Sequence, residues 1–233
     1  MRKLLTFGGT TLGIRPKIYC FWTTVSILLA VALAGFSSES VTRLLVIVFL
    51  FVQIAWRSTL AKVLPWFSPK TRFIVLGTVL AAVVEGCHMI STPVFRSLRI
   101  GWDTSFTQGL LYYVIDLLFT VPAYLVIFSV IWYFINQYHY SLWHYVVVMG
   151  LAHTLGDGGI FFFLNAPQML LFLPYPMTNY HAIDLIPFLA VCDRLRPERL
   201  SSPFAYLAVP GVIGTYLVCG TIIKLLGRAF GLE

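Results

Sequence analysis

The chain has 233 residues, of which 59% are hydrophobic and only 11% are charged. An ordinary soluble domain has about 45–50% apolar and about 25% charged residues, so this composition excludes a soluble globular domain. We therefore expect an all-α fold, a polytopic transmembrane helix bundle. One crossing takes about 20 apolar residues, so about seven spans use nearly the whole chain and leave a single domain, residues 1–233.

The net charge of +7 does not require a nucleic-acid partner. The basic residues form short clusters beside apolar runs, where positive charge sets the orientation of a membrane protein. We expect membrane lipids as partners and a multi-pass protein of the plasma or inner membrane. The oligomeric state is left open.

The first apolar run follows a basic segment that extends as far as Lys17. The small residues Ala32 and Ala34 imitate a signal-peptide cleavage site, but the long basic segment favours retention of this run as a helix. The positive charge before the run predicts a cytoplasmic amino terminus.

Seven apolar segments follow one another along the chain. They are residues 18–36, 41–64, 73–91, 106–135, 142–164, 169–191 and 204–226. The sixth contains Pro174, Pro176 and Pro187 and is expected to be a poor helix. It either crosses the membrane, which gives seven spans and an external carboxyl terminus, or is re-entrant, which gives six.

Acidic and histidine side chains recur inside these apolar segments. Glu85 and His88 are three residues apart in the third segment, so they share one face of a helix and can contact each other. The fourth segment carries a polar stripe of Tyr112, Asp116 and Thr120, which is expected to face other helices.

The fifth segment is interrupted at its centre by a glycine-rich stretch. His153 and Asp157 are four residues apart, and Gly158 and Gly159 follow directly. Each glycine lowers helix propensity by about 1 kcal/mol, which favours an unwound backbone of the kind that lines transporter sites. The alternative is that the glycines only allow a neighbouring helix to approach closely.

The sixth segment supplies a third acid and histidine pair, His181 and Asp184. Residues 100–193 contain neither lysine nor arginine, so the carboxylates within them have no basic partner nearby in the sequence. Such acids in a bilayer are either protonated or neutralised by a cation. Histidine with carboxylate is a normal ligand set for zinc or iron, and it also relays protons.

Three interpretations follow. The first is a membrane-embedded, metal-dependent enzyme of the hydrolase type acting on a lipid-like or isoprenoid substrate. The others are a proton-coupled carrier of a small solute and a structural or assembly subunit. The motifs HExxH, GxSxG, GxGxxG and the P-loop are absent from the sequence. For a divalent metal, zinc or iron, the expected ligands are His88, His153, Asp157 and His181. The expected catalytic residues are Glu85, Asp116 and Asp184.

Overall fold

The computed structural model describes residues 13–35, 37–197 and 203–232. Within them the fold is an all-α bundle, as predicted, and six helices are long and apolar enough to span a membrane. The expected basic residues Arg2 and Lys3 before the first span, and Arg199 after the sixth segment, lie outside the described residues.

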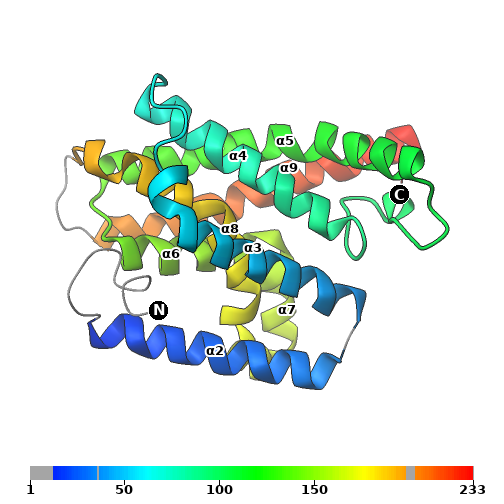
Figure 1. The fold of residues 1–233 in the computed structure, drawn as a ribbon, viewed down its shortest axis with the longest axis horizontal. Coiled ribbons are helices and arrows are strands. Elements are labelled where there is room, and N and C mark those ends of the chain that lie inside the picture. The colour runs from blue at the N-terminus through cyan, green and yellow to red at the C-terminus, as the bar shows by residue number, and fades with distance from the viewer. Residues whose placement is uncertain (1–12, 36, 198–202, 233) are drawn as a thin grey trace.

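Figure 1 shows long helices that run in alternating directions. The helices α2, α3, α4 and α5 are followed by the broken segment α6, η2 and α7, and then by α8 and α9. Their bounds are α2 Ile14–Ala34, α3 Ser38–Leu60, α4 Pro69–His88, α5 Phe106–Gln137, α6 Leu142–Thr154, η2 Leu155–Gly159, α7 Ile160–Asn165, α8 Pro174–Val191 and α9 Ala208–Phe230. Short 3₁₀ turns are η1 Arg96–Leu98, η3 Pro167–Phe172, η4 Cys192–Arg194 and η5 Pro203–Leu207.

Serine residues fix where four of these helices begin. Ser37, Ser68, Ser105 and Ser141 each accept a hydrogen bond from a backbone N–H in the first turn of the helix that follows. The first N–H groups of a helix lack partners within the helix, and a serine hydroxyl satisfies one of them. These caps therefore separate one apolar run from the next.

Arg72 holds one end of the bundle together. Its guanidinium is buried and donates hydrogen bonds to the carbonyl groups of Ala61, Val63 and Ala190. It therefore joins the start of α4 to the residues that follow α3 and to the last turn of α8. At the same end the Tyr140 hydroxyl donates to the Ala205 carbonyl.

The opposite end is closed by the loop between α4 and α5. Arg99 donates to Ser38 at the start of α3, and Ser97 donates to the Leu232 carbonyl after α9. The Val94 N–H donates to an Asp116 carboxylate oxygen at 2.9 Å. Asp116 therefore anchors this loop.

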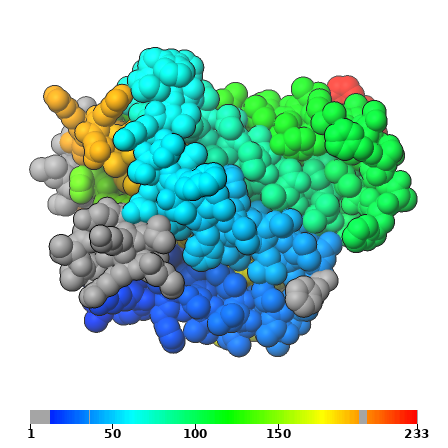
Figure 2. All heavy atoms as spheres, in the orientation of Figure 1, coloured from blue at the N-terminus to red at the C-terminus, as the bar shows by residue number. Residues whose placement is uncertain are grey.

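The helix α8 lies at the centre of the bundle, and 14 of its residues are buried. It packs against α2, α3, α4 and α6. On the face drawn in Figure 2, the blue atoms of α2 and α3 and the cyan atoms that follow them lie in front, and only a few yellow atoms can be seen. Gln53 of α3 locks it further by donating to the Ala182 carbonyl at 2.7 Å.

The sixth segment is thus a helix despite its prolines, although it is not among the six helices apolar enough to span a membrane alone. Pro174 and Pro176 lie in its first turn, where the missing N–H groups have no acceptor within the helix in any case. Pro187 is accommodated inside it.

We predict that the end of α8 lies on the cytoplasmic side, because Ala190 is bonded to Arg72 beside the basic loop before α4. In a cysteine-free background, Lys62→Cys and Asp193→Cys should be protected from a membrane-impermeant thiol reagent added outside intact cells. Ser97→Cys in the opposite loop should react. Labelling of Asp193→Cys from outside would show that α8 is re-entrant.

Candidate functional site

The fifth apolar segment is broken at the predicted place. The turn at η2 has π-helical bonding, and the backbone leaves the helical region at Asp157 (φ −79°, ψ 40°) and Gly158 (φ 87°). Only glycine adopts the Gly158 conformation without strain. At Gly159 an added Cβ would collide with the Thr154 carbonyl oxygen. These two glycines therefore permit the break, and breaks of this type are frequent at functional sites.

His153 lies directly before the break and forms a buried pair with Asp184 of α8. The His153 Nε2 and an Asp184 carboxylate oxygen are 3.3 Å apart, and both side chains are fully buried. The His153 Nδ1 is 2.7 Å from the Tyr216 hydroxyl, and the Tyr145 hydroxyl donates to Asp184 at 3.4 Å. His153 Nε2 and the other Asp184 oxygen have no hydrogen-bond partner among the described residues, so the 3.3 Å contact is within ion-pair distance but lacks hydrogen-bond geometry.

Two further carboxylates are each bonded to a tyrosine from another helix. Tyr124 of α5 donates to Glu85 of α4 at 2.6 Å, and Tyr180 of α8 donates to Asp157 at 2.6 Å. The Tyr180 ring also stacks on the His153 ring, with centroids 5.2 Å apart and planes at 11°. Polar groups from several helices thus converge beside the break.

We call Glu85, Tyr124, Asp157, Tyr180 and Tyr216 the tyrosine–carboxylate cluster. Their charges and hydroxyl dipoles lie close enough to interact with one another. Asp157 is exposed and the other four are only partly buried, in contrast to the fully buried His153 and Asp184. The cluster is therefore accessible from outside the protein, whereas the acid and histidine pair is not.

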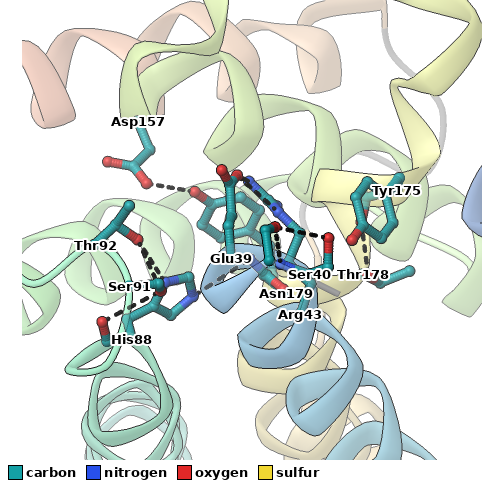
Figure 3. Close-up of polar contacts among 12 residues, drawn as sticks. Glu39, Ser40, Arg43, His88, Ser91, Thr92, Asp157, Tyr175, Thr178 and Asn179 are labelled. Atoms are coloured by element: carbon teal, nitrogen blue, oxygen red, sulfur yellow. Dashed lines mark hydrogen bonds and ion pairs between the residues drawn. The ribbon is translucent and has the colours of Figure 1, made fainter. Parts of the chain in front are cut away.

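A second set of polar side chains lies near Asp157, where α3, α4 and α8 meet (Figure 3). The His88 Nδ1 is 3.0 Å from the Thr92 hydroxyl, and its Nε2 is 3.4 Å from the Asn179 amide nitrogen. Arg43 forms an ion pair with Glu39 at 2.8 Å. The Arg43 guanidinium also lies 5.2 Å from the centroid of the Tyr175 ring.

The three pairs that are close in the sequence do not pair locally. Among the described residues no hydrogen bond or ion pair joins Glu85 to His88, His153 to Asp157, or His181 to Asp184. His181 instead contacts the Tyr19 hydroxyl of α2 at 2.6 Å. Helical spacing gives the shared face, but most of the polar partners come from neighbouring helices; His88 is the exception, because its nearest partner is Thr92 directly after its own helix.

The expected metal ligands do not converge. In the described ranges no group of three or more His, Cys, Asp or Glu side chains is placed to hold a metal ion. His88, His153, Asp157 and His181 each contact different partners. The metal centre stays a prediction, and the geometry around these four residues gives it no support.

Tyrosines are the residues that reasoning from the sequence missed. Tyr124, Tyr145, Tyr180 and Tyr216 each bond to one of the predicted acids or histidines. One signal was available, because Tyr124 continues the stripe of Asp116 and Thr120 by one more step of four residues. Tyrosine in an apolar run otherwise resembles any aromatic packing residue.

These features define the class of the protein as a multi-pass, all-α membrane bundle with a polar centre at a helix break. A scan against protein-family models gives no match, and searches of curated proteins and of solved structures give none either.

Proposed function

We propose that this protein is a proton-coupled carrier of a small solute. His153 and Asp184 are the groups that bind and release the proton, and the tyrosine–carboxylate cluster at the break binds the solute. The observation that carries the proposal is the fully buried contact of His153 with Asp184, one turn before a discontinuous helix. Acid and histidine chains relay protons in membrane transporters, and discontinuous helices line their substrate sites.

The charge balance of the pair explains how coupling works. With one proton on the pair beyond the neutral imidazole and the carboxylate, His153 and Asp184 are neutral overall, whether that proton is on the imidazole or on the carboxylate. Without it, one negative charge is buried in the bundle, and a buried charge is costly unless it is paired. Loss of the proton therefore favours a change around the pair. Either a ligand binds nearby, or the side chains around the break repack.

The test uses purified protein in liposomes that contain a pH-sensitive dye. Amines, sugars, amino acids and carboxylic acids are added one at a time to vesicles with an imposed pH gradient. We expect one class to drive proton movement above the level of empty liposomes. His153→Gln and Asp184→Asn should abolish it, while Asp193→Asn, on an exposed residue outside the network, should leave it unchanged.

Two outcomes would contradict the proposal, the first by removing the proton site and the second by replacing the function. Proton movement that persists in Asp184→Asn would show that the pair is not the proton site. Stoichiometric zinc or iron in the purified protein, lost in His153→Gln, would support the metal-dependent enzyme on a lipid-like substrate instead.

A further inference from the structure

We propose that the tyrosine–carboxylate cluster binds an organic cation, a small amine or a quaternary ammonium compound. This inference rests on the proposed function and names the class of the solute. The first observation is the combination of side chains: Tyr124 and Tyr180 donate to the carboxylates of Glu85 and Asp157, and Tyr216 is close enough to interact electrostatically with both acids. Aromatic faces attract cations through the ring quadrupole, and several rings together form the usual site for an ammonium group.

The second observation is a charge that the protein leaves uncompensated. Within the described residues neither Glu85 nor Asp157 forms an ion pair with lysine or arginine. Tyr124 and Tyr180 satisfy one oxygen of each carboxylate by hydrogen bonding but add no positive charge. Glu85 is in the last turn of α4, and a carboxylate inside the bundle without a positive partner is costly, so a bound cation stabilises the cluster.

Arg43 is a basic residue that interacts electrostatically with Asp157. It is already engaged, since it forms an ion pair with Glu39 at 2.8 Å and lies over the Tyr175 ring. The net charge of Glu39, Arg43, Glu85 and Asp157 in their ionised forms is −2. This balance disfavours an anionic solute and favours a cation.

The ligand geometry favours an organic cation over a metal ion. Glu85 and Asp157 lie on different elements and each already accepts a short tyrosine hydrogen bond of 2.6 Å. A metal ion bound by these two carboxylates would lack a third ligand, because the described residues provide no group of three or more His, Cys, Asp or Glu side chains placed to hold one. An ammonium group can contact the ring faces while the hydrogen bonds remain in place.

The same contacts connect the cation to the proton. Tyr216 belongs to the cluster and its hydroxyl is 2.7 Å from His153, and the Tyr180 ring stacks on the same imidazole. A cation held by these tyrosines would lie directly beside the proposed proton site. Under the carrier proposal, occupation of either site therefore changes the affinity of the other by the same factor.

The experiment measures binding of radiolabelled tetraphenylphosphonium and of radiolabelled choline to the purified full-length protein in detergent. Both affinities should fall when the pH is lowered. Asp157→Asn should weaken binding of at least one of them by about tenfold or more, and Tyr180→Leu by about tenfold, as expected for loss of one cation–π contact. Tyr180→Phe keeps the ring and should cost less than Tyr180→Leu.

Tyr133→Leu is the matched control, because Tyr133 is an exposed tyrosine of α5 outside the cluster. It should bind both probes as the unaltered protein does. Failure of both cations to bind, or equal binding by Asp157→Asn, would overturn the inference. If sugars or acids then move protons in liposomes, the proposed carrier function remains and the organic-cation site is rejected. If cations bind but move no protons, the organic-cation site is supported and the proposed proton-coupled carrier function is rejected.

Discussion

Replacing Asp184 alone with leucine is expected to lower the free energy of unfolding by about 3–5 kcal/mol, the cost of breaking a buried acid and base pair. His153 would lose its carboxylate neighbour at 3.3 Å, and the Tyr145 hydroxyl would lose its acceptor. Both side chains are fully buried, so water cannot replace the missing contacts. Denaturation in mixed detergent, followed by circular dichroism, measures the change.

The double variant His153→Phe with Asp184→Leu separates stability from function. It removes both members of the pair and leaves apolar side chains, so it should regain at least half of the stability lost by Asp184→Leu, as replaced buried ion pairs often do. It should nevertheless show no proton exchange in liposomes. Exchange at the unaltered rate would mean that the pair serves packing only.

Gly159→Ala is expected to have the second large effect. The added Cβ would collide with the Thr154 carbonyl oxygen, and backbone atoms cannot move aside as a flexible side chain can. We expect a loss of about 1–3 kcal/mol, the usual range for overpacking, together with loss of exchange, because Asp157 would no longer be held beside Tyr180. Denaturation and liposome assays on the same preparation measure both.

Gly214→Ala is the matched control for this substitution. Gly214 is a helical residue of α9 with no atom within 4 Å of an added Cβ. Alanine is the better helix former by about 1 kcal/mol, so this variant should be neutral or slightly more stable. Equal effects of the two substitutions would show that the π-type turn has no special role.

The sequence allowed the helical class and the break to be predicted, because both depend on local composition. Apolar runs separated by serine and proline gave the helices, and the glycines beside Asp157 gave the break. The partners of the polar groups could not be predicted in the same way. His153 contacts Asp184, which is 31 positions later, and only the packing of α6 against α8 brings them together.

The helix α8 shows why hydropathy gave an uncertain answer for the sixth segment. Hydropathy measures how well a helix tolerates lipid, but α8 is surrounded by protein and buries Asn179, His181 and Asp184 against its neighbours. Its polar residues and prolines lower its apparent suitability as a span. Burial within the bundle removes that penalty, which depends on contacts that no short window of sequence contains.

The central position of α8 has a consequence for biosynthesis. Asn179, His181 and Asp184 make it a poor candidate to leave the translocon alone and enter lipid, because each polar group would be exposed there. Its packing partners α2, α3, α4 and α6 all precede it in the chain. They are therefore synthesised first, and α8 can insert directly against an assembled surface that already offers Gln53 and His153 as partners. The order of the helices along the chain is thus also a workable order of assembly.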